Sequence, residues 1–270
     1  MATALLEPAV APPARDYISF SSLSLYRSCP LRWYFKYRVG LPEDSVSAAL
    51  VYGSGIHRAI QLHFTELLAG NPPPHSDALL TEFWVGWAER HPQQIRFGKD
   101  ESLDSLGHLA QRTLLAFQQS DAALPHGEIL AVEEELRGQV VPGCPDVLGR
   151  VDLIVDAGDA LVIADWKTAR SRWSRAQVED SAEQLLLYGE LAKDFCPGKP
   201  LRLEFVVLTK TKDVAVDRHT LLVDPAAVAR TKRIVETVWR AIEAEHFYPA
   251  PSAMNCPACP YRDECRAWGG

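Results

Sequence analysis

Apolar positions recur every three or four residues through much of the first half of the chain, which is the spacing of amphipathic helices. Residues 19–38 combine serine capping candidates with helical spacing. In "GSGIHRAIQLHFTELLAG" (53–70) a glycine turn is expected to open a helix that "NPPPH" ends. Two further helices are expected near 76–91 and 101–119. The first half of the chain is therefore predicted to be mainly helical.

After "LPHGE" (124–128) the hydrophobic period changes from about 3.6 to about 2, which indicates strands. The expected order is strands near 129–137, 147–156 and 160–166, a helix at 177–194, strands at 201–210 and 214–223, and a helix at 225–246. This order predicts an α/β or α+β core, a mixed central sheet flanked by helices and carrying a helical insertion.

Composition is that of an ordinary globular chain, with 270 residues, 47% hydrophobic and 23% charged. Residues 1–16 are rich in alanine and proline and are expected to be flexible. The sequence has neither a long apolar run nor a basic leader, so we expect no membrane span or secretory signal, and a cytoplasmic protein with reduced cysteines. The net charge is 28 − 35 = −7, which argues against a general nucleic-acid coat and leaves DNA contact to local features.

Two apolar stretches carry carboxylates. Asp152 interrupts "GRVDLIVD", and Asp165 follows four apolar residues in "ALVIADWKT", where Lys167 shares its strand face. A buried carboxylate is costly unless it is paired or binds a cation. An Asp165–Lys167 salt bridge at a strand end is the simpler interpretation. Two acids beside a lysine also suit Mg²⁺ or Mn²⁺ with a bound phosphate.

These elements, taken in order along the chain, resemble the PD-(D/E)XK nuclease superfamily and its RecB-like branch, which includes CRISPR-associated exonucleases. The matching elements are Ser21, Leu23, Tyr26, Cys29 and Pro30 in "SSLSLYRSCP", His57 in "YGSGIH", Asp152 in "GRVD", "DWK" (165–167), and "QLLLY" (184–188). The resemblance implies a restriction-endonuclease-like core in one RecB-like nuclease domain, 17–270. A helical insertion would occupy about 66–127.

The resemblance also implies roles for individual residues. Metal ligands would be His57, Asp152, Asp165 and the backbone carbonyl of Trp166. Lys167 would be the catalytic lysine beside the catalytic Asp152 and Asp165, and Gln184 and Tyr188, which lie on one helix face, would position the substrate. The family often has an acid on the preceding strand. Here "VEEEL" offers Glu133, Glu134 or Glu135, with Glu133 the candidate.

Four of the six cysteines form a second constellation, and Cys144 and Cys196 are expected to lie outside it. Cys256, Cys259 and Cys265 have the spacing C-x2-C-x5-C, which in a reducing compartment suggests a bound metal. Cys29 is the candidate fourth ligand, because similar RecB-like enzymes place one cysteine ahead of the nuclease core and three behind it. Thiolates suit either Zn²⁺ or a 4Fe-4S cluster, and the resemblance favours the iron–sulfur cluster. The tail, about 250–270, would then be joined to the N-terminal region.

Two basic segments with aromatic residues are candidates for DNA contact. In 27–38, four basic residues alternate with Trp33, Tyr34, Phe35 and Tyr37, which suits either base stacking or packing around the cysteine site. The second segment follows the catalytic strand, where Arg170, Arg172 and Arg175 surround Trp173. We expect DNA contacts from this second segment.

The expected function is a Mg²⁺- or Mn²⁺-dependent DNA nuclease, most simply an exonuclease on single-stranded ends. It would act in recombination, repair or CRISPR spacer acquisition. The chain has no "GxxxxGK[ST]" motif, so a helicase or a CRISPR integrase would be a separate partner. The alternative is a catalytically silent DNA-end-binding or scaffold subunit of a helicase–nuclease complex, although the complete residue set argues against it.

Overall fold

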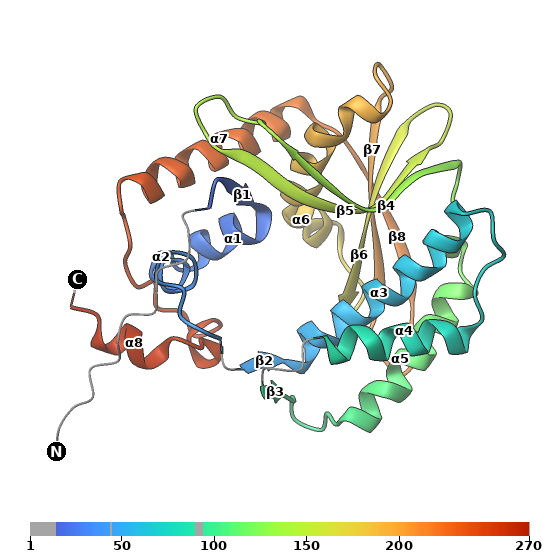
Figure 1. Ribbon diagram of the computed structural model, residues 1–270, viewed down its shortest axis with the longest axis horizontal. Helices are drawn as coiled ribbons and strands as arrows, with labels where there is room; N and C mark the ends of the chain where they lie inside the picture. Colours follow the sequence, from blue (N-terminus) through green and yellow to red (C-terminus); the bar gives the residue numbers. More distant parts are fainter. Residues whose placement is uncertain (1–14, 44, 90–93, 270) are drawn as a thin grey trace.

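The computed structural model describes residues 15–43, 45–89 and 94–269 (Figure 1). Most of the segment predicted to be flexible, 1–14, lies outside the described residues. The strands are β1 (Tyr17–Ser19), β2 (Ser45–Ser47), β3 (Gln94–Arg96), β4 (Glu128–Gly138), β5 (Asp146–Asp156), β6 (Leu161–Ala169), β7 (Leu201–Thr209) and β8 (Val216–Leu222). The helices are α1 (Phe20–Ser28), α2 (Pro30–Tyr34), α3 (Ala48–Leu68), α4 (Ser76–Ala88), α5 (Leu103–Gln118), α6 (Arg175–Ala192), α7 (Pro225–Glu243) and α8 (Arg262–Ala267), with short turns η1 (Phe35–Val39), η2 (Asp121–Ala123), η3 (Lys193–Phe195) and η4 (Cys256–Ala258).

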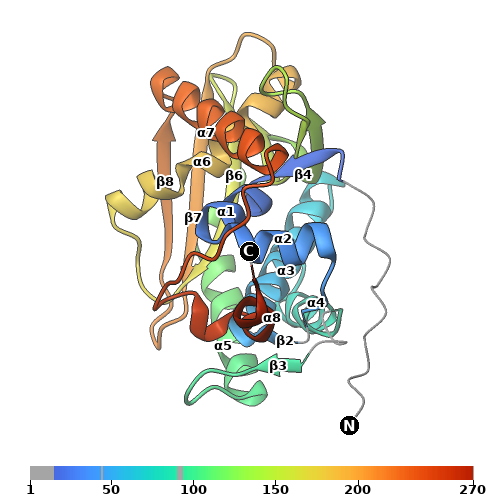
Figure 2. The same ribbon diagram turned by 90° about the vertical axis from the view of Figure 1, so that its left-hand side faces the viewer.

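One six-stranded mixed sheet carries the fold, in the order β1-β5-β6-β7-β8 with β4 paired to β5. β1–β5 and β6–β7 are parallel pairs, whereas β4–β5, β5–β6 and β7–β8 are antiparallel. Helices α1, α6 and α7 cover one face, and α3, α4 and α5 cover the other (Figures 1 and 2). The predicted central mixed sheet flanked by helices is confirmed.

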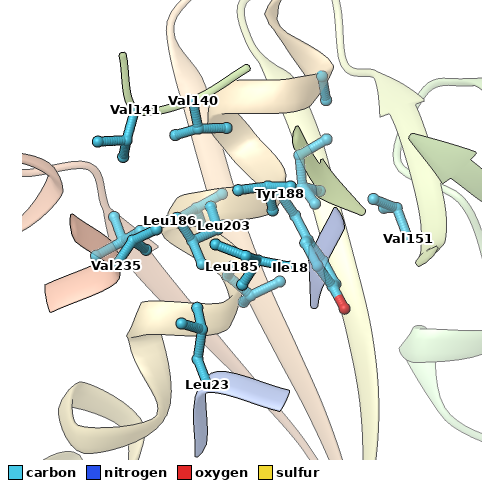
Figure 3. Close-up of a cluster of buried hydrophobic side chains, with 14 of the residues drawn as sticks. Ile18, Leu23, Val140, Val141, Val151, Leu185, Leu186, Tyr188, Leu203 and Val235 are labelled. Atoms are coloured by element: carbon cyan, nitrogen blue, oxygen red, sulfur yellow. The ribbon is translucent and has the colours of Figure 1, made fainter. Parts of the chain in front are cut away.

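Burial on both faces explains the long apolar runs in the central strands. Every residue of β7 from Leu203 to Thr209 is buried. Figure 3 shows Leu185 and Leu186 of α6 packed with Leu203 of β7 and Val235 of α7. This packing fixes the rotation of α6, so the residues on its remaining face have defined positions over the sheet.

Helix α3 corrects the expected glycine turn. It begins at Ala48, with the Ser47 side chain accepting a hydrogen bond from the Leu50 backbone N–H, and the glycines lie inside it. A Cβ on Gly55 would lie only 2.6 Å from a ring carbon of Phe83, and one on Gly53 would lie 3.3 Å from Thr168 Oγ1. The glycines therefore let α4 and β6 approach the helix closely.

Several short elements were not predicted, because elements of three to six residues are too short to show a period. These are β1, β2 and β3, of which β2 and β3 form a separate parallel pair, and α8 in the cysteine-containing tail. The segment expected as an insertion, about 66–127, contains α4, β3, α5 and η2 between α3 and β4. Among the described residues, no helix is both long enough and apolar enough to span a membrane.

The tail returns to the N-terminal segment. The Leu31 backbone N–H donates to the Tyr248 carbonyl at 3.0 Å, and the Tyr261 hydroxyl donates to the Leu41 carbonyl at 3.1 Å. A separate buried cluster joins Leu31, Phe35 and Tyr261, and Cys29, Cys259 and Cys265 pack against it. Figure 2 shows α8 beside α2. The two ends of the fold therefore meet where three of the predicted thiol ligands gather.

Candidate active site

The candidate site lies where two strands of the sheet separate. On one edge, β5 pairs with β6 as far as Leu153 opposite Ala164, and with β1 only from Asp146 to Leu148. Because β4 occupies the other edge of β5, residues 149–152 adjoin a gap between β1 and β6. Asp152 and Asp165 are the next residues beyond the last β5–β6 pair. The break in pairing thus brings both predicted carboxylates to the same opening.

Three potential metal ligands from distant segments meet at this opening. His57 of α3, Glu133 of β4 and Asp152 of β5 each offer one ligand atom, and these atoms lie within 4.8 Å of one another. His57 Nδ1 is 3.3 Å from Asp152 Oδ2, and the Trp166 backbone N–H donates to the same oxygen at 2.7 Å. Two oxygen donors and one imidazole can hold a divalent ion such as Mn²⁺.

Glu133 is the glutamate of "VEEEL" that belongs to the site. Its neighbours pair across the strands as Val132 with Leu153 and Glu134 with Val151, which places Glu133 opposite Asp152. Glu134 is exposed, whereas the Glu133 side chain is only 15% exposed. The φ angle of Glu133 is +53°, a left-handed conformation that is strained for a residue with a side chain. Such strain is common at functional sites.

Asp165 and Lys167 form the expected ion pair, with 2.7 Å between Lys167 Nζ and Asp165 Oδ2. The pair is not aligned as a hydrogen bond, however, and Asp165 Oδ2 is a buried oxygen with no hydrogen-bond partner among the described residues. Lys167 Nζ instead donates to Gln184 Oε1 at 3.0 Å, and Gln184 Nε2 donates to the Tyr188 hydroxyl at 3.0 Å. The structure therefore links Lys167 to both predicted α6 residues, and the ion pair with Lys167 is the contact that Asp165 Oδ2 makes.

Burial dominates the electrostatics of the site. Desolvation raises the pKa of Asp165 to about 6, opposed by the charge of Lys167. Desolvation, reinforced by the charge of Asp152, raises the pKa of Glu133 to about 7. Burial raises the pKa of Asp152, but the charge of His57 and its hydrogen bond outweigh burial, so the pKa of Asp152 is lowered. Three crowded carboxyl groups with one imidazole make a site that a divalent cation would stabilise.

Metal binding at this site is expected to strengthen with pH. Burial lowers the pKa of His57, but the Asp152 charge and hydrogen bond outweigh it and raise the pKa to about 9. The neutral imidazole that binds metal is therefore the minor form at pH 7, and binding must release its proton. We expect the Mn²⁺ association constant to rise about tenfold per pH unit between about pH 7.5 and 8.5, and more steeply below pH 7, where Glu133 must also lose its proton. Calorimetric titration of the wild type and His57→Asn measures this, and a flat profile in the wild type would contradict it.

Trp166 contributes to the site through its backbone. Its side chain is buried and stacked on Phe64, with 5.3 Å between ring centroids, while the residue lines the cavity that contains His57 and Lys167. The Trp166 N–H holds Asp152, as described above. Metal coordination by the Trp166 carbonyl stays a prediction.

The expected DNA-contact loop is not arranged as one basic surface. Arg172 is paired with Asp217 at 2.8 Å, and Arg175 with Glu179 at 2.8 Å. Trp173 is half-buried, its ring tilted against Phe205 at 5.3 Å. Arg170 is exposed and lines a separate cavity. Their role in DNA binding stays a prediction.

In the N-terminal aromatic segment, packing is the alternative that the structure supports. Trp33 is 7% exposed, stacks on Phe247 and donates its indole N–H to Ser22 Oγ at 2.8 Å. Phe35 is buried in the cluster that adjoins the cysteines. Neither ring is free to stack on a base, so the base-stacking interpretation is wrong for both.

The site cavity, about 660 Å³, also exposes residues that the sequence interpretation missed. Arg150 lies two residues before Asp152, and its guanidinium is 4.0 Å from the Glu133 carboxylate. Lys210 follows β7, and its backbone N–H donates to the Ala169 carbonyl at the end of β6. The signal available in the sequence was that two apolar strands, β6 and β7, are each followed directly by a basic residue, Arg170 and Lys210. Parallel pairing of the strands brings these two residues to the same edge of the sheet.

Gly149 provides a test of how Lys167 is positioned. A Cβ at residue 149 would lie 2.4 Å from Tyr188 Cε1, so Gly149→Ala must displace the ring that supports Gln184. We expect the variant to lower the turnover number about tenfold or more, with the Mn²⁺ affinity preserved. The matched control is Gly138→Ala, whose Cβ would meet only Leu191 at an ordinary 3.4 Å. Equal nuclease rates for the two variants would contradict this positioning role.

Comparison with known proteins identifies the class of this fold and site. The sequence profile of the PD-(D/E)XK nuclease superfamily matches residues 17–266, and the chain belongs to this superfamily. A crystal structure of a candidate exonuclease from Eubacterium rectale superposes with a TM-score of 0.58 at 14% identity, covering 93% of this chain and 88% of that one. The solved structure of SSO0001 covers 92% of this chain and 93% of its own at 14% identity, with a TM-score of 0.36 that is too low to indicate a shared fold. No curated protein matches the chain.

Proposed function

We propose that this nuclease-superfamily chain is a metal-dependent DNA exonuclease that hydrolyses phosphodiesters at single-stranded ends. The carrying observation is the convergence of His57, Glu133 and Asp152 within 4.8 Å, beside the Asp165–Lys167 pair. The likeness in fold to a protein named as a candidate exonuclease supports the exonuclease assignment.

The proposed ion is Mg²⁺ or Mn²⁺, held by His57, Asp152 and Asp165, with Glu133 and the Trp166 carbonyl as further ligands. The donor set fits because it is mostly hard oxygen, and because buried Asp165 Oδ2 has no hydrogen-bond partner among the described residues. An ion bound there supplies charge stabilisation for the phosphate and lowers the pKa of a bound water.

Lys167 is the proposed catalytic lysine. Its ammonium lies 2.7 Å from Asp165 Oδ2 and donates to Gln184 Oε1, and both contacts aim it from β6 into the site cavity. From there it can donate a hydrogen bond to a phosphate oxygen or to the attacking water. Gln184 and Tyr188 act by positioning: the Tyr188 hydroxyl fixes the Gln184 amide, whose oxygen is then directed at the lysine.

The proposed second cofactor is a 4Fe-4S cluster on Cys29, Cys256, Cys259 and Cys265. Burial raises the pKa of the Cys265 thiol, as do the charges of the other three cysteines, and Cys29, Cys259 and Cys265 pack against one buried cluster, which supports this ligand set. Thiolates suit either Zn²⁺ or a 4Fe-4S cluster, and the resemblance to RecB-like enzymes with one cysteine ahead of the nuclease core and three behind it favours the iron–sulfur cluster.

The proposed context is recombination, repair or CRISPR spacer acquisition in the cytoplasm. Unwinding would come from a helicase partner, or capture of new spacers from a CRISPR integrase partner. The six free cysteines suit a reducing compartment.

The proposal is tested with fluorescent single-stranded oligonucleotides, labelled at either end, and with circular single-stranded DNA. We expect the linear DNA to be degraded with Mn²⁺ or Mg²⁺, no degradation with EDTA, and survival of the circle. Lys167→Ala controls for contaminating nucleases. If the chain binds DNA ends but cuts none with either ion, the exonuclease proposal fails and the binding-subunit alternative holds.

A further inference from the structure

A second cavity, about 910 Å³, lies beside the candidate active site, and most of its charged lining residues are basic. It is formed by α5, by the segment that leads into α5 and by the segments that follow β6 and β7. Its charged lining is five cations, Lys99, Arg112, Arg170, Lys210 and Lys212, and two carboxylates, Glu101 and Asp213. The excess of positive charge contrasts with the net charge of −7 for the chain.

The lysines of this cavity lack the partners that the other lysines have. The chain has eight lysines, and those outside the cavity are ion-paired, namely Lys36, Lys167, Lys193, Lys199 and Lys232. In the described part of the chain, no carboxylate oxygen lies within the 4.0 Å ion-pair distance of Lys99, Lys210 or Lys212. All three unpaired lysines therefore line a single cavity, which indicates a site for an anion that the chain does not itself supply.

Lys210 joins this cavity to the active site, because it lines both. Its backbone N–H donates to the Ala169 carbonyl at 2.6 Å, which ties the end of β7 to the end of β6. Arg170 stands three residues beyond Lys167 on the same chain, roughly 10 Å along an extended segment. An extended polyanion bound at Lys167 would therefore reach the Lys99–Lys210–Lys212 cavity over about the same distance.

Lys210 is also partly desolvated. Burial lowers the pKa of its ammonium, and the charge of Arg170 lowers it further, while Glu101 acts in the opposite direction. The ammonium lies 5.8 Å from the centre of the Tyr52 ring. Holding Lys210 and Arg170 close together costs free energy that a bound phosphate would offset.

The cavity that adjoins the active site at Arg150, rather than at Lys210, has a different lining. A cavity of about 690 Å³ shares Arg150 with the site cavity and contains Gln184 and Tyr188. Its remaining polar lining is chiefly serine hydroxyls and an asparagine, with Glu135 as its carboxylate, namely Ser19, Ser21, Ser24, Ser28, Asn255 and Glu135. Cationic charge is thus concentrated on the Lys210 side.

We propose that the Lys99–Lys210–Lys212 cavity binds the sugar–phosphate backbone of the DNA strand on one side of the scissile phosphodiester. This inference rests on the proposed function and names where that substrate is held. Phosphates a few nucleotides from the cleaved bond contact the lysines together with Arg112 and Arg170. The strand segment on the serine-lined side is held without comparable charge.

Binding is measured by fluorescence anisotropy of a single-stranded oligonucleotide with the full chain carrying Lys167→Ala, so that the probe stays uncut. The test variant adds Lys99→Ala, Lys210→Ala and Lys212→Ala. The control adds Lys193→Ala, Lys199→Ala and Lys232→Ala, the same change of charge among ion-paired lysines. The logarithm of the DNA association constant falls with the logarithm of the salt concentration, and each lost phosphate contact reduces the magnitude of this slope by about 0.7. The slope of the test variant is therefore shallower by about 2. An unchanged slope, or an equal fall in both variants, overturns the inference.

A second measurement avoids any effect of the substitutions on folding. Neutral methylphosphonate linkages are placed singly along the oligonucleotide and binding to the Lys167→Ala chain is measured. Two or three positions on one side of the cleaved bond should each weaken binding severalfold, and the same positions should have no effect in the test variant. Equal sensitivity on both sides would contradict the proposal. If the wild type cuts no DNA, but replacing the three lysines still makes DNA binding less dependent on salt, then the proposed nuclease function fails and the proposed DNA-backbone site is supported.

Discussion

Asp165→Asn is expected to lower the rate of DNA cleavage at least about a thousandfold. The substitution preserves the side-chain volume but replaces the Oδ2 carboxylate oxygen that lacks a hydrogen-bond partner among the described residues. It also removes the negative charge 2.7 Å from Lys167 Nζ, and with it one of the two contacts that hold the lysine. Metal affinity and lysine positioning are then lost together. Initial rates on a labelled oligonucleotide over a range of Mn²⁺ concentrations measure the effect.

The matched control is Asp159→Asn, an exposed aspartate in the β5–β6 turn that pairs with Arg202 at 2.9 Å. It changes the net charge equally and is expected to leave the rate within about twofold of the wild type. Thermal melts should show that Asp165→Asn stays folded, because a neutral amide in a buried, carboxylate-rich site relieves repulsion. Comparable cleavage by Asp165→Asn and Asp159→Asn would remove Asp165 from the catalytic residues.

Cys259→Ser is expected to have the largest effect on stability. Cys259 packs against the cluster of Leu31, Phe35 and Tyr261, where the C-terminal tail meets the N-terminal helices. If four thiolates hold one cluster there, losing one ligand releases the tail from residue 29 as well. We expect the melting temperature of anaerobically purified protein to fall by about 10 °C, and absorbance near about 400 nm to disappear.

Cys196→Ser is the matched control, because Cys196 is outside the predicted ligand set and its thiol lies 3.7 Å from Asp156 Oδ2. It should keep both the colour and the melting temperature. Metal analysis separates the two cofactors: about four irons per chain support the cluster. A colourless wild type with one zinc per chain would contradict the iron–sulfur assignment, while leaving the predicted set of thiol ligands intact.

The sheet and the strand that carries Asp165 and Lys167 could be predicted because their signals are local. Buried strands read as apolar runs, and Asp152 and Asp165 stand out as charges within such runs. The convergence of His57 with Asp152 was available only through the family resemblance, since no periodicity relates α3 to β5. The structure brings these side chains together where the β5–β6 pairing ends, a feature of the sheet that a linear pattern does not contain.

Other features depend on contacts that the sequence does not display. Gly55 suggested a turn, but its role is to admit Phe83 of a neighbouring helix. The choice of Glu133 among three glutamates depends on its burial and on a left-handed φ angle opposite Asp152. The sequence around Trp33 mixes basic and aromatic residues, as DNA-binding surfaces often do. The Trp33 ring is nevertheless buried, because the C-terminal tail returns and stacks Phe247 on it.

The most direct test of the central claim is the position of a divalent ion in crystals of the wild-type protein soaked with Mn²⁺. Anomalous difference maps recorded near the manganese edge should show a peak bounded by His57, Glu133 and Asp152, within about 2.5 Å of at least two of these side chains and next to Asp165 Oδ2. Absence of a peak at these residues, in crystals of protein that cleaves DNA with Mn²⁺, would contradict the assignment of this opening in the sheet as the catalytic metal centre.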